Sequence, residues 1–179
     1  MSMHHPSQRR KPLDTIRLIE AAFEGVTLGS GVSLRETDVL DSYGGDEERA
    51  AARQRDELTD WRRIPDGDID RRDYALCFMD EESLRFHLPA YMRFALRRHL
   101  DTELSAPNST LYQLCDPECV QRLVAFFTDR QVEAVRAFLI TCLDIGDDYL
   151  DVSGVPSALP RWRPGPGSTE SPTDPESAG

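Results

Sequence analysis

The sequence predicts a single α+β domain that is mostly helical and has one short antiparallel β-hairpin packed against helices. Three observations lead to this class. Apolar residues recur at intervals of three and four in several segments, as on one face of an α-helix. Two runs rich in β-forming residues, YALCFM and LRFHL, flank a polar segment of hairpin-loop size. The chain has 179 residues, 39% of them hydrophobic, which is enough for one core but too few for two full domains.

We expect three regions along the chain. Residues 1–12 form a flexible N-terminal arm, residues 13–150 a single globular domain, and residues 151–179 a disordered tail. The tail holds half of the chain's twelve prolines, and its apolar side chains are too few to offset the entropy of ordering it. Trp162 stands between two arginines in this tail, and we leave open whether it is an incidental aromatic or a binding motif.

The first part of the predicted domain contains two helices separated by a loop. Apolar residues from Leu13 to Phe23 recur at helical spacing, and Gly25 provides a stop signal. The glycine-rich residues 26–45 are predicted to be a loop. Residues 46–61 begin with acids and place their arginines later, which suits the dipole of a surface helix. We leave open whether this second helix docks on the core.

The β-hairpin is predicted at residues 74–88, with Asp80–Ser83 as its loop. If Met79 pairs with Leu84, one face of the hairpin is entirely apolar, and helices must cover it because an isolated hairpin is marginally stable in water. His87 then lies on the opposite, half-exposed face.

The helices that cover the hairpin are predicted over residues 89–101 and 117–145. Pro89 suits the first position of a helix, where its missing N–H costs nothing. Asp116 reads as the N-cap of the next helix. The sequence TDRQ at residues 128–131 has the form of a capping box and is expected to open the last helix.

The charge of the chain argues against two classes of partner. The formal net charge is −11 and the isoelectric point is about 4.8, so phosphate backbones and anionic membranes repel the chain. Its arginine doublets are offset by neighbouring aspartates. We therefore expect no binding to nucleic acid or membranes. We expect the partner to be a protein, and the charge favours a basic one.

The compartment is expected to be the cytoplasm. No run approaches the roughly 18 consecutive apolar residues that span a bilayer. No apolar segment of a secretory signal follows the basic residues near the N-terminus. The four cysteines should then remain reduced thiols.

The order of four segments resembles a known family. These are LIEAAF, W-x-x-IP, CFMDEESLRFHLPAYM and FFTDRQVEAVRAFL. They resemble an uncharacterised bacterial family, the domain of unknown function six-seven-one-four, over about residues 15–145. The most specific run is RF-x-LPAY, from Arg85 to Tyr91. The resemblance implies an aromatic at the position of His87 in many members, and it implies no activity, cofactor or site residue.

Two hypotheses for the function follow. The first is a small acidic interaction domain, an adaptor or neutralising protein without catalytic activity, whose surface includes Trp61, Arg85, His87 and Tyr91. The alternative is a small enzyme that uses the thiol of Cys119 or the imidazole of His87, or the two as nucleophile and base, with an Asp or Glu as orienting group. A helix start can lower the pKa of such a thiol.

We expect neither metal nor cofactor. Cys115 and Cys119 have the spacing of half a zinc site, and His87 or His99 could add a third ligand, but a second thiol pair is missing from the sequence. No glycine-rich segment is followed by the Lys and Ser or Thr of a P-loop. We therefore assign no catalytic residue.

Overall fold

The computed structural model describes residues 11–146 and 148–164. Within these two ranges the chain forms α-helices and two short 3-10 helices, and it contains no β-strand. The fold is therefore all-α, and the predicted α+β class with its β-hairpin is wrong. None of the helices in these ranges is both long and apolar enough to cross a membrane.

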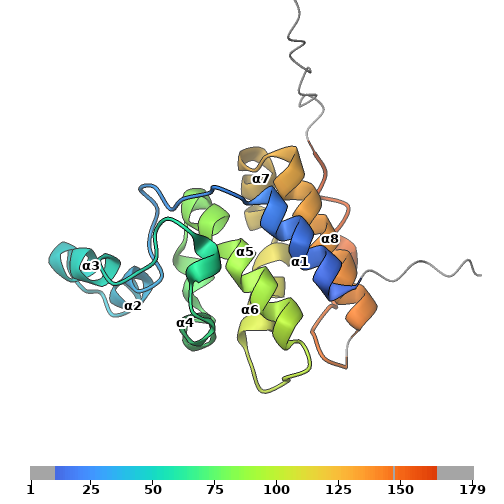
Figure 1. Ribbon diagram of the computed structural model, residues 1–179, viewed down its shortest axis with the longest axis horizontal. Helices are drawn as coiled ribbons and strands as arrows, with labels where there is room; N and C mark the ends of the chain where they lie inside the picture. The colour runs from blue at the N-terminus through green and yellow to red at the C-terminus, as the bar shows by residue number, and fades with distance from the viewer. Residues whose placement is uncertain (1–10, 147, 165–179) are drawn as a thin grey trace, which may run out of the picture.

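The helix that organises the fold is α5, which runs through the middle of the molecule (Figure 1). It contacts α1, α4, α6, α7 and both 3-10 helices, while α1 lies along α8 on one flank. In chain order the elements are α1 (Pro12–Ala22), α2 (Glu36–Asp41), α3 (Asp46–Arg53), η1 (Trp61–Arg63), α4 (Asp66–Arg71), η2 (Ala75–Phe78), α5 (Glu81–Arg98), α6 (Ala106–Cys115), α7 (Pro117–Phe126), α8 (Asp129–Ile145) and α9 (Val155–Ala158).

The polar residues expected to form the hairpin loop instead begin α5. The Asp80 carboxylate accepts a hydrogen bond from the Ser83 backbone N–H at 2.8 Å, which is an N-cap. Two glutamates follow in the first turn and two arginines stand in the last, an order that suits the helix dipole. Pro89, predicted as the first residue of a helix, lies inside α5.

The apolar runs around Asp80 resemble strands because α5 is buried on nearly every side. Twelve of its 18 residues are buried, so its sequence lacks the polar face that marks an amphipathic helix. Periodicity alone does not distinguish a buried helix from a buried strand. The run before Asp80 forms the 3-10 helix η2.

The caps predicted for the later helices are confirmed. Asp116 accepts the Cys119 N–H at 2.8 Å and opens α7. Thr128 and Gln131 form a reciprocal capping box at the start of α8, with bonds of 3.3 and 3.1 Å. These bonds close within four residues of sequence, and the caps therefore need no tertiary contact.

Helices α2 and α3 are set apart from the other helices (Figure 1), and we call them the α2–α3 arm. The predicted loop over residues 26–45 contains α2, and the helix predicted over residues 46–61 stops at Arg53. Glu36 on α2 binds Arg53 of α3 at 3.0 Å, and a second Arg53 nitrogen donates to the Gly29 carbonyl at 2.6 Å. Polar contacts therefore hold the two helices of the arm together.

Residues 151–162 pack on the core, where the sequence predicts the start of a disordered tail. Trp162 is fully buried, and its indole N–H donates to the Leu114 carbonyl at 3.0 Å. Arg136 on α8 donates to the carbonyls of Leu159 and Trp162 at 3.0 and 2.8 Å. The folded part thus reaches at least Trp162. Residues 165–179 of the predicted tail and residues 1–10 of the predicted arm lie outside the described residues.

Replacing Trp162 by alanine tests this packing. Trp162→Ala removes a fully buried ring and leaves a cavity, so the free energy of unfolding should fall by about 3–5 kcal/mol. Chemical denaturation measures the change. Arg163→Ala, at the exposed next residue, is the control and should change it by less than about 0.5 kcal/mol. Equal stability of the two variants would show that the segment does not belong to the core.

Candidate functional site

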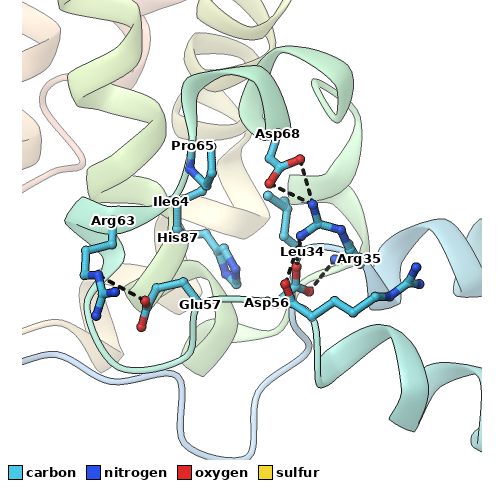
Figure 2. A pocket seen from close by; sticks show the side chains of 10 residues that line it. Leu34, Arg35, Asp56, Glu57, Arg63, Ile64, Pro65, Asp68 and His87 are labelled. Carbon is cyan, nitrogen blue, oxygen red and sulfur yellow. Dashed lines mark hydrogen bonds and ion pairs between the residues drawn. The ribbon is translucent and has the colours of Figure 1, made fainter.

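A pocket of about 330 Å³ lies where the base of the α2–α3 arm meets the rest of the fold (Figure 2). His87 of α5 is its most buried lining residue, with no exposed surface. Leu34, Ile64 and Pro65 contribute apolar wall. The other lining residues are charged and come from the two ends of the arm, η1 and α4.

The local structure of α5 fixes the state of His87. Its Nδ1 lies 2.8 Å from the Ser83 carbonyl oxygen, one helical turn earlier. A carbonyl only accepts hydrogen bonds, so Nδ1 carries the proton and Nε2 carries a lone pair. Burial lowers the pKa of His87 to about 4, although the Ser83 carbonyl and the charge of Asp56 oppose this shift. The imidazole is therefore neutral at physiological pH.

The Nε2 atom of His87 is a buried acceptor without a partner. No described protein group donates a hydrogen bond to it. Leaving a buried acceptor unpaired costs about 1–3 kcal/mol, and most buried polar atoms in proteins are paired. His87 lines the pocket, so the unpaired acceptor belongs to a side chain of the inner pocket wall.

A buried ion-pair network forms the inner wall. Arg35 donates to Asp56 at 2.6 Å and to both oxygens of Asp68 at 3.0 and 2.9 Å. The Asp56 side chain is only 3% exposed. The hydrogen bond to Asp56 raises the pKa of Arg35 against the effect of burial, and the charge of Asp68 adds to the rise. Arg35 therefore stays ionised between two carboxylates.

Arg72 extends this network and connects the arm to the body of the fold. It donates to Asp38 of α2 at 2.7 Å and to Asp68 of α4 at 3.2 Å. Burial opposes ionisation of Asp38, but hydrogen bonds from Arg72 and Tyr74 outweigh it and lower the pKa of Asp38. Burial, together with the bond to Asp38, raises the pKa of Tyr74 to about 12. The arm is thus attached by charge-assisted hydrogen bonds.

The outer part of the pocket holds less constrained cations. The Arg63 side chain is 72% exposed, and its Nε lies 3.5 Å from a Glu57 oxygen. That Glu57 carboxylate also accepts bonds from the hydroxyl and backbone N–H of Thr59, which lower its pKa. Within the described residues, the exposed Arg55 guanidinium has no recorded partner. Both arginines are therefore available to a ligand.

Of the four residues expected on an interaction surface, only His87 lines this pocket. Trp61 is buried, and its indole donates to the Phe23 carbonyl at 2.9 Å. Tyr91 is buried too, and its hydroxyl donates to the Arg72 carbonyl at 2.6 Å. These two aromatics are core residues. The expected surface therefore does not exist as one patch.

Arg85 lies at a different place. Its guanidinium stands over the Phe126 ring, 5.8 Å from the centroid, beside a second cavity of about 620 Å³. This cavity is bounded by the end of α1 and the start of α8. Arg85 is half-buried and lines this cavity.

The structure does not pair Cys119 with His87. The Cys119 sulfur is buried and accepts a hydrogen bond from the Gln113 amide at 3.0 Å. Burial raises the pKa of Cys119 despite that bond, which is opposite to the activation expected at a helix start. Burial also raises the pKa of Cys115 to about 11. Within the described residues, no group of three or more His, Cys, Asp and Glu side chains is arranged to hold a metal ion.

Sequence reasoning missed the charged residues that complete the pocket. Asp56 and Asp68 follow Arg35 by 21 and 33 positions in the chain, and no sequence motif joins the three residues. Arg35 was expected in a loop and Asp56 on a surface helix. The only available signal was the excess of charged residues in this region, which any solvated surface also shows.

The chain matches one protein family over residues 12–162, described as a family of unknown function (DUF6714). It belongs to this family. The resemblance found in the sequence is thereby confirmed, and DUF6714 extends to Trp162, the residue that anchors the C-terminal segment. No curated protein and no solved structure matches the chain significantly. Membership in DUF6714 brings no activity with it.

The buried imidazole makes folding stability depend on pH in a specific direction. The unfolded chain protonates this histidine below its ordinary pKa of 6.5, whereas the folded chain keeps it neutral down to about 4. The unfolded state therefore binds more protons in this window, and stability falls as the pH falls. Between about pH 7 and about pH 5, His87 should lower the free energy of unfolding by about 2 kcal/mol.

His87→Leu is the matched variant for this prediction. Leucine has a similar volume and no titratable group, so the variant should lose this part of the pH dependence whatever its absolute stability. Urea denaturation at several pH values compares the two slopes. Identical slopes in the two chains would mean that His87 is accessible to protons in the folded state.

Proposed function

We propose that this chain binds a small polar molecule in the pocket over His87. The observation that carries the proposal is the unpartnered Nε2 atom of a fully buried imidazole that lines the pocket. A ligand that donates an O–H or N–H to this atom removes the cost of the unpaired acceptor. The resemblance implies an aromatic at this position in many relatives, so the proposal concerns chains that carry histidine here.

The composition of the pocket supports binding of a small ligand. Its volume of about 330 Å³ falls at the small end of known ligand sites. Such sites combine apolar walls with a few fixed polar groups, and Leu34, Ile64 and Pro65 provide that wall beside the Arg35 network. The ion pairs hold Arg35 in place before a ligand arrives, which reduces the entropy lost on binding.

The same lining favours binding over catalysis. The residues that line the pocket include no serine, threonine, cysteine, lysine or tyrosine that could act as a nucleophile. An imidazole whose pKa is about 4 is a weak base at neutral pH, because general bases work best with a pKa near the operating pH. The Arg35 guanidinium is held between two carboxylates and stays ionised, so it offers no proton to a reaction.

Histidine-selective NMR tests the proposal. We expect members of a library of small polar compounds to shift the Nε2 resonance of His87 and to raise the melting temperature of the wild-type chain. The same compounds should leave the melting temperature of His87→Leu unchanged. A library in which every compound leaves the His87 resonance in place would refute ligand binding at this site.

A second candidate function, a protein-interaction role, is favoured by Tyr43 at the tip of the α2–α3 arm. Its side chain is 97% exposed, and its backbone has φ of 58°, in the left-handed region. Non-glycine residues adopt this region at a cost, so Tyr43 weakens the fold without packing on it. Exposed acids surround it in the sequence, which fits a basic protein partner: Asp41, Asp46, Glu47 and Glu48.

The variant Tyr43→Gly distinguishes the effect of this residue on the stability of the fold from its effect on partner binding. Glycine adopts positive φ freely, so the variant should be more stable by about 1 kcal/mol. It should also retain less of any partner captured by the wild-type chain from cells of its source, as quantified by mass spectrometry. Tyr112→Ala, at a tyrosine that is 78% exposed on α6, is the control. Equal retention by Tyr43→Gly and the wild type would remove the tip from the interface.

A further inference from the structure

The inner part of the pocket carries an excess of negative charge. Asp56 and Asp68 line it together with the guanidinium of Arg35. Arg72 also binds Asp68 but is shared with Asp38, so three carboxylates meet two guanidiniums in this network. The side chains of Asp56 and Asp68 are 3% and 11% exposed, so solvent screens them weakly. The neutral acceptor Nε2 of His87 belongs to the same inner region. A cationic group that also donates hydrogen bonds suits this end of the pocket.

The outer part of the pocket, formed by its more exposed lining residues, carries an excess of positive charge. Its exposed guanidiniums are those of Arg55 and Arg63, and the one remaining lining carboxylate is that of Glu57. Three donors from Thr59 and Asp60 already bind one Glu57 oxygen, and the Arg63 contact to the other is 3.5 Å long. Figure 2 shows Arg63 and Glu57 on one side of the pocket and Arg35, Asp56 and Asp68 on the other. An anionic group suits the exposed guanidiniums.

We propose that the ligand is a small zwitterion, a free amino acid or a short ω-amino acid, bound with its amino group inward and its carboxylate outward. This inference rests on the proposed function of the pocket and specifies its ligand class. At neutral pH such a molecule carries both charges at once. Its two ends therefore match the two ends of the pocket.

Each end of the zwitterion finds a defined partner. One ammonium N–H donates to His87 Nε2, which is the only buried side-chain nitrogen or oxygen without a hydrogen-bond partner among the described residues that line this pocket. The others face the carboxylates of Asp56 and Asp68, whose oxygens can accept more bonds than Arg35 and Arg72 supply. The carboxylate of the ligand is a bidentate partner for either exposed guanidinium.

Ligands with a single charge fit less well. A phosphate or a simple carboxylate placed over His87 meets the two inner carboxylates, and like charges repel strongly where water is excluded. An amine without an acidic group satisfies the inner end but leaves Arg55 and Arg63 unused. The volume of about 330 Å³ further limits the ligand to a small molecule.

Calorimetry with a small panel of compounds tests the ligand class on the full chain. The probes are glycine, serine, leucine and 4-aminobutyrate, each alongside its N-acetyl and carboxamide derivatives. We expect at least one zwitterion to bind, and each of its two derivatives to bind about tenfold more weakly or worse, because each loses one charge-assisted contact. An N-acetyl derivative that binds as tightly as its parent would overturn the proposed orientation.

Variants of the pocket assign the two ends. His87→Leu should abolish binding of the zwitterion. The double variant Arg55→Gln with Arg63→Gln should weaken the zwitterion about tenfold but leave its carboxamide derivative unchanged, because the amide never used the guanidiniums. Arg62→Gln is the control, since this exposed neighbour pairs with Asp60 and does not line the pocket. Equal weakening of both ligands by the double variant would exclude a carboxylate contact at the pocket entrance.

The outcome separates the ligand class from the proposed function. If no zwitterion of the panel binds while other compounds shift the His87 Nε2 resonance, the ligand class is wrong and the binding function stands. If neither the zwitterions nor the other compounds shift that resonance, both are wrong.

Discussion

The burial of α5 is the constraint on which the rest of the structure depends. Twelve of its 18 residues are buried, and six other elements pack around it. A helix satisfies its backbone hydrogen bonds internally, so it can pass through a core without exposed polar groups. Polar side chains on such a helix must find partners in the interior. The Ser83 hydroxyl donates to Asp80 and accepts the Val32 N–H, and Nδ1 of His87 binds the Ser83 carbonyl, but Nε2 has no partner among the described residues. The candidate site is therefore a consequence of placing a histidine on the central helix.

The α2–α3 arm is held differently from the bundle. Its contacts with the body include Arg35 with Asp68 and Arg72 with Asp38, both charge-assisted. Buried ion pairs gain little net stability because both ions lose hydration, but their geometry is specific. A charged seam of this kind fixes the arm in one place and leaves room between the side chains. The pocket occupies that seam, so a ligand there touches both arm and body.

The sequence predicted parts of this structure and missed others for identifiable reasons. The N-caps at Asp116 and Thr128 were predictable because each bond joins residues three positions apart. The apolar runs of residues 74–88 have no helical period and therefore predict a hairpin with Asp80–Ser83 as its loop, whereas in the structure Asp80 accepts the Ser83 N–H as the N-cap of α5. His87 was singled out, but on the face of a hairpin that does not exist. Its partners in the pocket were not foreseen.

The sequence by itself determined the elements whose signals are local: the amphipathic stripes of α1, α7 and α8, the caps that start α7 and α8, the acidic charge and the family. Only the tertiary structure decided that α5 is a buried helix, that Trp162 closes the core, and that Arg35, Asp56 and Asp68 meet beside His87. The physical reason is the range of the interactions. A cap or a stripe is completed within a few turns of one segment, whereas burial on all sides and the convergence of charges depend on how distant segments pack together.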